Sequence, residues 1–210
     1  MKKHFWKLEY SLTLFVLLGF LMLFFPVKLE NYIQANMITK WNDRFEKASY
    51  MFSVVNAQKS DEILKSFAKA ESPEQREKLL LQLIKPYLRL RETDKTLKRY
   101  KPRFMNGLRV SKKDFYYFNE LYFSDKQIVG VKDIVNDKND AWFMIMFDIN
   151  GILPPNTWGR DIFGVYIYDE GKIVPFGYDK DLSELRIDCS KKGTGTTCSY
   201  YYRIGGGFHD

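Results

Sequence analysis

The stretch MKKHFWKLEYSLTLFVLLGFLMLFFPVKLENY, residues 1–32, decides how the rest of the chain is interpreted. Three lysines precede an uncharged run, residues 10–27, that is rich in Leu and Phe. A helix rises about 1.5 Å per residue, so a helical run of this length nearly spans a hydrocarbon core of about 30 Å. We therefore predict a short basic leader over residues 1–9 and a transmembrane helix over residues 10–27.

Two other interpretations of the apolar run are weaker. A buried core helix seldom lacks charged residues for five turns. A cleaved secretory signal peptide normally ends at a small-x-small site, whereas the bulky Phe24-Phe25-Pro26 follows here. Because lysines before a span stay in the cytoplasm, we expect a single-pass protein of the inner membrane. Its N-terminus is then cytoplasmic and its C-terminal part periplasmic or at the cell surface.

Beyond this run, hydrophobic residues continue at intervals of three and four, which is the spacing of one helix face. Charged residues such as Lys40, Asp43 and Lys47 occupy other positions. Residues 28–57 are therefore predicted to continue the helix as an amphipathic segment that buries its apolar face against a folded head. The expected apolar face comprises Leu29, Ile33, Met37, Trp41, Phe45, Ala48, Phe52 and Val55.

Residues 58–114 are expected to form a helical and basic connecting region. Ser60 is placed to cap a helix over Asp61–Ala70, whose acidic first residues favour the positive end of the helix dipole. Between Lys85 and Lys113 there are eleven Lys and Arg residues but only two acidic ones, a local formal charge of about +9. Such a segment attracts nucleic acid or anionic headgroups, or is simply a solvated surface. The candidate basic surface comprises Lys95, Lys98, Arg99, Lys101 and Arg103.

A second helix is signalled inside this region. Ser72 is a candidate N-cap, with Pro73 at the first helical position and Gln75 three residues after the cap. The helix is expected to run towards Ile84, and Pro86 is expected to end or kink it.

From Phe115 onwards the pattern changes to short β-branched and aromatic segments separated by turn residues, which is typical of strands. Asp169–Gly171 between two of them predicts a hairpin. The expected fold class is α+β, with the long helix packed on a small antiparallel sheet in a head of residues 115–210. The predicted strands are QIVGVKDIV (127–135), AWFMIMFDI (141–149), DIFGVYIY (161–168), KIVPFG (172–177) and SYYYRI (199–204).

The segment Asp148–Asp161, DINGILPPNTWGRD, connects two of these strands. Asp148 and Asn150 are each placed to accept a backbone N–H two residues on, and either Arg160 or Asp161 is placed to tie the far end back. A rigid, self-stapled connector is therefore predicted. Calcium is the alternative, with Asp148, Asn150 and Asp161 as candidate ligands. Because calcium takes six to eight oxygens and only two carboxylates are local, we expect no cofactor.

Cys189 and Cys198 are the only cysteines, and His4 and His209 are the only histidines. In a cytosolic chain the cysteines are two unrelated thiols or half of a metal site. In an exported chain they form a disulfide that closes a short loop, and this is our prediction. Both histidines lie near chain ends, where a cleft that could hold a catalytic base is not expected. The sequence therefore does not favour an enzyme.

The N-terminus resembles that of type IV pilins and pseudopilins, in which a basic leader precedes Phe, a Glu inside the helix and a later Pro. Phe5, Glu9 and Pro26 hold these positions. The resemblance implies that Phe5 begins the mature chain and that Glu9 neutralises the N-terminal amine of a neighbouring subunit. His4 stands where the family has Gly, and Lys7 where it has an apolar residue, which puts processing by prepilin peptidase in doubt.

The segment over residues 26–52 and the head also look like a group of bacterial pilin-like proteins. The head motif is Asp-x-Asn-Gly, then Pro-Asn, then Gly-x-Asp-x-Phe, followed by Cys…Gly…Cys near the C-terminus. The resemblance thus touches nearly the full chain. Some pseudopilins carry a calcium ion near this part of the head, so the resemblance keeps calcium as an alternative here. The matching head residues are Asp148, Asn150, Gly151, Pro155, Asn156, Gly159, Asp161, Phe163, Cys189, Gly193 and Cys198.

The resulting functional prediction is a membrane-anchored pilin-like or pseudopilin subunit of a type IV pilus or type II secretion filament. Its partners are then the membrane, related subunits and the assembly machinery. The alternative is a membrane-anchored extracytoplasmic binding protein that does not assemble and uses the basic surface for nucleic acid. Salt-sensitive binding is what that alternative requires.

Overall fold

The structure of the protein is a computed structural model that describes residues 2–91, 97, 100–135, 140–168 and 171–208. Within the first range, the side chains of residues 2–8, 24–28, 59–61, 63–64 and 68 lie outside the description. The chain forms two compact units, residues 1–37 and 38–210.

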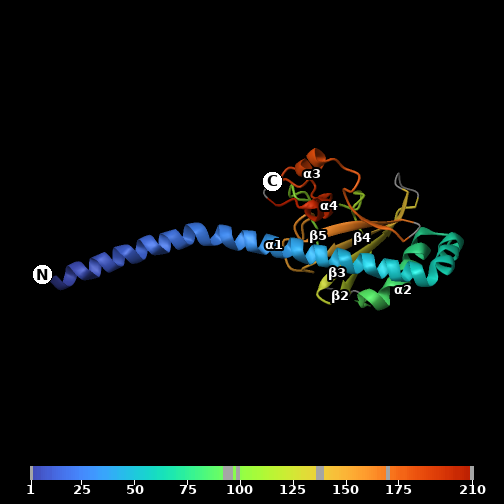
Figure 1. Ribbon diagram of the computed structural model, residues 1–210, viewed down its shortest axis with the longest axis horizontal. Coiled ribbons are helices and arrows are strands. Elements are labelled where there is room, and N and C mark those ends of the chain that lie inside the picture. Colours follow the sequence, from blue (N-terminus) through green and yellow to red (C-terminus); the bar gives the residue numbers. More distant parts are fainter. Residues whose placement is uncertain (1, 92–96, 98–99, 136–139, 169–170, 209–210) are drawn as a thin grey trace. The chain divides into compact units, whose positions relative to one another are not determined.

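Helix α1 spans Lys2–Lys69 without a break and belongs to both units (Figure 1). Among the residues whose side chains are described, no helix contains a stretch both long and apolar enough to cross a membrane. The predicted span over residues 10–27 includes residues 24–27, whose side chains fall outside that description. The transmembrane helix and the leader over residues 1–9 therefore stay predictions.

The separate helix predicted over Asp61–Ala70 is wrong, because α1 runs through Ser60 and ends at Lys69. A serine caps a helix only where the chain enters the helix, and the residues before Ser60 are already helical. Tertiary packing favours the continuation. Phe67 is buried, and its ring lies 5.1 Å from that of Phe143 on the sheet, centroid to centroid.

The apolar face predicted for the amphipathic helix is confirmed in the second unit. Trp41, Phe45, Ala48, Phe52 and Val55 are all buried. The Trp41 ring stacks on Phe163 at 4.9 Å, and its Nε1 donates a hydrogen bond to Ser199 O at 2.8 Å. In the first unit, by contrast, Leu29 and Ile33 of the same predicted face are exposed. The sheet therefore covers only the later part of this face.

Helix α2, Pro73–Leu88, begins as predicted. The Ser72 hydroxyl accepts the backbone N–H of Gln75 at 3.3 Å, and the Gln75 side chain accepts a backbone N–H in return. Pro86 does not end the helix, which continues to Leu88 and stops where Arg89 adopts a φ of 49°. A proline so close to the C-terminus removes one helical hydrogen bond at most, so the last turn persists.

Six strands form one antiparallel sheet whose order follows the sequence, which confirms the α+β class. Four of the predicted strands are present, whereas β1 and β2 were not predicted. The Asp169–Gly171 hairpin has its first two residues outside the described part of the chain. The strands are β1 (Leu90–Arg91), β2 (Leu121–Ser124), β3 (Gln127–Asp133), β4 (Ala141–Asp148), β5 (Ile162–Tyr168) and β6 (Ile173–Pro175).

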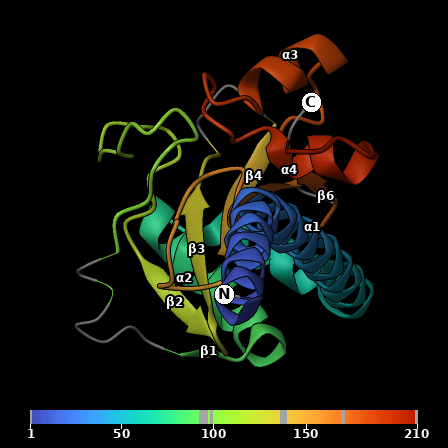
Figure 2. The ribbon, with the colours of Figure 1, turned by 90° about the vertical axis from the view of Figure 1, so that its left-hand side faces the viewer.

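Both faces of the sheet are covered (Figure 2). Successive side chains of a strand point to opposite faces, and nearly all of β4 is buried. On one face, Phe147 of β4 lies 6.4 Å from Trp41 of α1. On the other face, Met144 and Met146 belong to a core cluster with Trp158 and Phe176. The segment from Tyr100 to Phe118 supplies further side chains to this second core.

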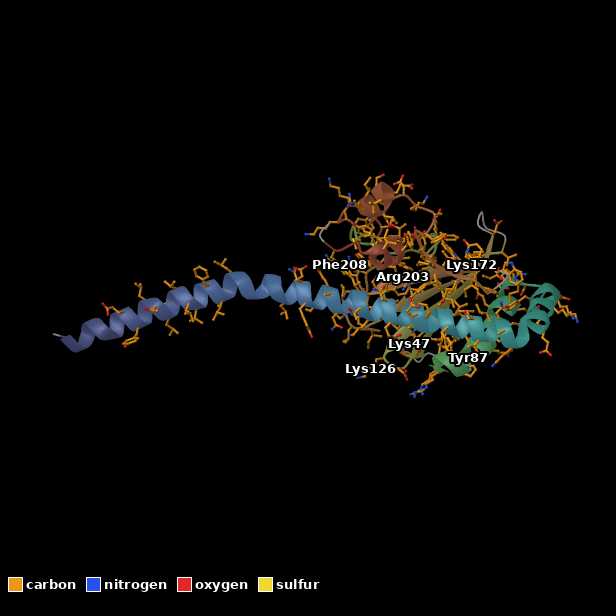
Figure 3. The ribbon with its side chains drawn as sticks, in the orientation of Figure 1. Lys47, Tyr87, Lys126, Lys172, Arg203 and Phe208 are labelled. Carbon is orange, nitrogen blue, oxygen red and sulfur yellow. A yellow bond between two sulfur atoms is a disulfide. The ribbon has the colours of Figure 1, made fainter. Side chains whose placement is uncertain are left out.

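The strand predicted over residues 199–204 is wrong. This part of the chain forms the short helix α4 (Cys198–Tyr201) and the 3-10 turn η2 (Tyr202–Ile204), and helix α3 (Leu182–Asp188) precedes them. Tyr201 and Tyr202 are adjacent and both are buried, which a helical turn allows and a half-buried strand does not. Arg203 reaches back to α1, where its guanidinium pairs with Glu46 at 2.7 Å (Figure 3).

Candidate functional site

Apolar side chains of α1 are exposed on every side of the helix in the first unit. Phe15, Val16, Leu17 and Leu18 are between 45% and 73% exposed, and four successive residues complete a full turn. We call Tyr10–Leu23 the apolar segment, since large hydrophobic residues along all of it are exposed. An apolar patch of this kind marks a surface that contacts a membrane or another protein.

Of the three residues predicted to act in assembly, only Glu9 has a described side chain, and it is exposed. Its backbone oxygen accepts a hydrogen bond from the Thr13 hydroxyl at 2.8 Å, which satisfies a carbonyl in the helix rather than the carboxylate. Phe5 and Pro26 lie in helical residues whose side chains are outside the description. The proposed role of Glu9 is therefore compatible with its exposure and stays a prediction.

The connector Asp148–Asp161 is held by its own side chains at its first end. Asp148 Oδ1 accepts the backbone N–H of Asn150 at 3.2 Å, as predicted. Its other oxygen accepts a hydrogen bond from the Tyr100 hydroxyl at 2.7 Å, a contact that the sequence did not indicate. Asn150 differs from the prediction, since its amide donates to Pro154 O at 3.3 Å.

The far end of the connector is tied by Asp161. Its two oxygens accept the backbone N–H groups of Asn156 at 2.8 Å and Thr157 at 2.6 Å, which confirms the predicted closure. Gly151 and Gly159 both have positive φ angles, 72° and 77°. A Cβ at Gly159 would lie 2.7 Å from Cys198 Sγ, so only glycine lets the connector approach the disulfide.

Two further residues of the head motif stabilise the connector and the strand that follows it. Pro155 O accepts a hydrogen bond from the Thr157 hydroxyl at 3.1 Å. Phe163 is fully buried and stacks on Trp41, so the first residues of β5 are clamped beneath α1. The motif residues therefore act as a packing unit that joins the connector to the helix.

The two carboxyl groups of the connector are both fully buried. Burial raises the pKa of Asp148 well above its usual range, and the negative charge of Asp161 raises it further. Burial also raises the pKa of Asp161 to about 6, against the opposing effect of its N–H donors. Each charge disfavours the other in a poorly solvated site. Asp161 therefore changes its protonation at about pH 6, and Asp148 keeps its proton to a higher pH than a solvated carboxyl does.

Calcium binding by Asp148, Asn150 and Asp161 is not favoured by these contacts. In the part of the chain that the structure describes, no group of three or more His, Cys, Asp or Glu side chains is placed to hold a metal ion. Both oxygens of Asp148 and of Asp161 already accept hydrogen bonds within the protein. A calcium ion would have to replace these bonds to gain the six to eight oxygens it needs.

The predicted disulfide between Cys189 and Cys198 is present, with 5.4 Å between the two Cα atoms. Asp188 accepts hydrogen bonds from the loop that the disulfide closes. Asp188 Oδ1 accepts both the N–H and the hydroxyl of Thr194 at 2.7 Å, and Oδ2 accepts those of Thr197 at 3.0 and 2.8 Å. Burial alone raises the pKa of Asp188, but these four bonds outweigh burial and leave its pKa below the usual value.

The basic surface is only partly described. Lys95, Lys98 and Arg99 lie outside the described residues, while Lys101 and Arg103 are exposed. We call Lys101–Lys113 the basic loop, and it turns back on itself where Phe104 N donates to Leu108 O at 2.8 Å. Leu108 is 66% exposed at this turn. Arg103 and Arg109 form a bridge pair directly behind it.

A groove of about 490 Å³ runs beside α2 and the first strands of the sheet. Glu77 anchors one end, because its Oε1 accepts the backbone N–H of Asp133 at 2.8 Å. Burial raises the pKa of Glu77, and the charges of Asp133, Glu120 and Glu74 add to this effect. We call this cavity the α2 groove, and its lining residues are Glu74, Glu77, Lys78, Leu81, Gln82, Lys85, Leu90, Glu120 and Tyr122.

Sequence reasoning missed Tyr100, Asp188 and the α2 groove. Tyr100 sits among basic residues, and nothing in that pattern indicates a contact with Asp148. Asp188 had a readable signal, because it directly precedes a cysteine and a Gly- and Thr-rich segment whose N–H and hydroxyl groups it accepts. The groove depends on β1 and β2, two strands too short or irregular to recognise.

The chain matches no protein-family model, no curated protein and no solved structure. The resemblance to pilin-like proteins therefore rests on the residues named above.

Proposed function

We propose that this chain is a membrane-anchored, pilin-like subunit that assembles with related subunits into a filament of the type IV pilus or type II secretion kind. It works by packing of its N-terminal helix and by contacts of its head, not by catalysis. The observation that carries the proposal is the apolar segment, which is exposed on every side of α1.

A helix that is hydrophobic all round is stable only where lipid or other chains surround it. At about 1.5–3 kcal/mol for each large apolar side chain removed from water, covering the whole segment gains at least as much free energy as the stability of an ordinary folded domain. The membrane provides one cover for the segment, and the same segment of neighbouring subunits provides another. A pilin-like subunit is covered by the membrane before assembly and by neighbouring subunits in the filament.

The head supports the same proposal through its sheet and its disulfide. An antiparallel sheet lies across the later part of α1, and a disulfide closes a short loop near the C-terminus. Disulfides persist in oxidising compartments, which agrees with an extracytoplasmic head. Glu9 then lies near the membrane surface as the candidate partner of a neighbouring amine, with Lys7 as an additional charge beside it.

The test is photo-crosslinking of the full chain in its own membrane. Phe15→p-benzoylphenylalanine places the probe in the apolar segment, where Phe15 is 73% exposed. We expect crosslinks to the apolar segment of a second copy or of a related subunit, in the inner-membrane fraction. Tyr50→p-benzoylphenylalanine, at a residue of α1 that is 74% exposed in the head, is the matched control and should not reach that segment.

Intact-mass measurement of the same sample identifies the first residue. A chain that begins at Phe5 and crosslinks through position 15 supports the filament. A chain that begins at Met1, stays in the membrane and gives no crosslink between subunits selects the non-assembling binding protein instead. Recovery in the soluble fraction with no such crosslink would contradict the membrane anchor itself.

A further inference from the structure

Two exposed features of the head are complementary in shape and charge. The α2 groove is a hollow lined by two leucines and by more carboxylates than lysines, and the basic loop is a turn with an exposed leucine at its tip and arginines on both sides. Neither takes part in the packing that connects α1 to the sheet. Each therefore remains accessible when the head is folded.

The carboxylate end of the α2 groove is built by Glu74, Glu77 and Glu120. Glu74 and Glu120 are exposed and Glu77 is half-buried, and the half-buried Leu81 follows Glu77 by one helical turn. Leu90 lines the other end of the groove, because it pairs with Ser124. The nearby Asp133 is already neutralised, because both of its oxygens accept hydrogen bonds from the Arg76 guanidinium. The three glutamates repel one another, and a cation entering the groove relieves that repulsion.

Lysines also line the groove, but the carboxylates outnumber them. Lys78 and Lys85 oppose three glutamates, which leaves one excess negative charge. The basic loop is more one-sided, since it contains five Lys and Arg residues and no acidic residue. Opposite charges across a contact guide encounter and fix its orientation.

The tip of the basic loop has the form of a knob. Leu108 is 66% exposed, and the flanking Arg103 and Arg109 are also exposed. Arg103 Nη1 donates to Gly107 O at 3.2 Å, which stiffens the turn. An exposed leucine flanked by two arginines fits a groove that offers Leu81 and three glutamates, because the leucine gains apolar contact while the arginines pair with the carboxylates.

The two features lie at opposite ends of the sheet. The carboxylate end of the groove is next to Asp133, which pairs with Phe143 near the start of β4. The basic loop is bonded to the segment after β4, because Arg103 N donates to Asn156 O at 2.9 Å. An eight-residue strand at about 3.4 Å per residue separates these ends by roughly 25 Å.

We propose that the α2 groove of one head receives the Leu108 tip of the basic loop of a second copy of this chain. Since unlike surfaces meet, the contact is heterologous, and it repeats into an open assembly unless its rotation closes a ring. Only the extent of that assembly rests on the proposed function. The contact between two copies is testable by itself.

The experiment uses the full chain in its own membrane with Leu108→p-benzoylphenylalanine. We expect a dimer whose crosslinked peptides lie within Glu74–Leu90 or Glu120–Tyr122 of the second copy. Leu153→p-benzoylphenylalanine is the control, because Leu153 is 63% exposed on the connector. Its crosslinks should not reach the α2 groove.

Charge reversal then tests the pairing. Arg109→Glu and Glu120→Lys, each added to the Leu108 probe, should lower the crosslinked fraction about tenfold, and the two together should restore most of it. Lys126→Glu, at the exposed turn between β2 and β3 (Figure 3), should leave it unchanged. An intact disulfide on a non-reducing gel shows that each variant has folded.

The outcomes separate this inference from the proposed function. Crosslinks from position 15 without any from position 108 to the groove overturn the inference and leave the filament standing. Crosslinks from position 108 alone keep the head contact and overturn helix assembly. Absence of both overturns both, and a crosslink from position 108 that the double reversal fails to rescue overturns the assigned charge pairing.

Discussion

Helix α1 contains two apolar segments with opposite surroundings. The apolar segment Tyr10–Leu23 is exposed, whereas the large hydrophobic residues between Trp41 and Val55 that face the sheet are buried. Both are rich in large hydrophobic residues, but the first contains no charged residue, whereas the second contains Asp43, Arg44, Glu46 and Lys47. The difference lies in pattern, because the first segment is apolar on every side and the second on one face only.

The comparison shows which part of a helix the chain covers by itself. A single sheet covers one face of a helix, and the charged residues of the second segment occupy the face that remains in water. The first segment has no polar face to leave in water. This lack of a polar face is the basis of the proposed membrane and filament contacts.

The largest predicted difference between the segments concerns stability of the head. Trp41→Ala removes a fully buried ring, its stack on Phe163 and its hydrogen bond to Ser199. The free energy of unfolding should fall by about 3–5 kcal/mol. Leu17→Ala, in the exposed segment, should change it by less than about 0.5 kcal/mol. Chemical denaturation of both variants in detergent, followed by near-ultraviolet circular dichroism, measures this contrast.

Trp41→Phe refines the same comparison. It keeps an aromatic ring against Phe163 but removes the Nε1 donor and leaves Ser199 O without it. A loss between those of Trp41→Ala and Leu17→Ala is expected, because an unsatisfied buried carbonyl and a smaller ring each cost on the order of 1 kcal/mol. Equal losses for Trp41→Ala and Leu17→Ala would show that the sheet does not hold α1.

Removal of the disulfide is the next largest effect and is confined to the head. Cys189→Ser with Cys198→Ser should lower the free energy of unfolding by about 2–3 kcal/mol, from the entropy of closing a short loop. Insertion of the apolar segment into membranes should be unchanged. Denaturant titration of the head and flotation of the same variant with liposomes compare the two regions. Loss of flotation would mean that the regions are not independent.

A smaller effect follows from the buried pair Asp148 and Asp161. Raised folded-state pKa values mean that the native state holds protons more tightly, so this stability is present at low pH. The part due to Asp161 is lost as pH rises through about 6, and the part due to Asp148 continues to be lost as pH rises towards its raised pKa. The free energy of unfolding should therefore fall between pH 5 and pH 8, by on the order of 1–2 kcal/mol. Denaturation curves at three pH values in this window measure it.

Asp148→Asn tests the cause of that slope. The amide cannot hold the extra proton that native Asp148 binds, so the decline between pH 5 and pH 8 should become shallower. Asp179→Asn, at an exposed carboxylate, is the matched control and should keep the native slope. The lowered pKa of Asp188 has the opposite effect on the pH dependence of stability. That effect appears only at pH values below the usual pKa of Asp, so it lies outside this window. An unaltered slope in Asp148→Asn would exclude the pair as its source.

The smallest predicted effect is that of chelation. Because the carboxylate oxygens of Asp148 and Asp161 already accept protein hydrogen bonds, adding a chelator or millimolar calcium should leave the melting temperature of the head unchanged. Differential scanning calorimetry of the full chain in detergent makes this comparison. A rise of several degrees with calcium would restore the metal interpretation of the connector.

Periodicity and turn chemistry predicted much of this fold. The face from Trp41 to Val55, the N-cap Ser72, strands β3–β6 and the closure by Asp161 all follow from local patterns whose physical causes lie within a few residues. The disulfide was also predicted, from two nearby cysteines and the expectation that this part of the chain is exported. These features depend little on distant parts of the chain.

The wrong predictions concern features that depend on contacts with distant parts of the chain. Ser60 was read as a helix start, but contacts of Phe67 with the sheet keep α1 helical through it. Residues 199–204 have high β-propensity, yet the disulfide and the contacts of Ser199 and Tyr202 with distant residues place them in helical turns. Tyr100 and the α2 groove likewise depend on pairings across the sheet. Local sequence carries no record of such distant contacts.

Cysteine accessibility along α1 tests the central contrast most directly. In a chain whose native cysteines are paired in a disulfide, Leu14→Cys, Leu18→Cys and Tyr50→Cys each supply a single free thiol. All three positions are exposed within the isolated chain. With a membrane-impermeant maleimide on intact spheroplasts, we predict rapid labelling at position 50 and none at positions 14 and 18 until the membrane is dissolved. Labelling of all three at equal rates in intact membranes would contradict the account.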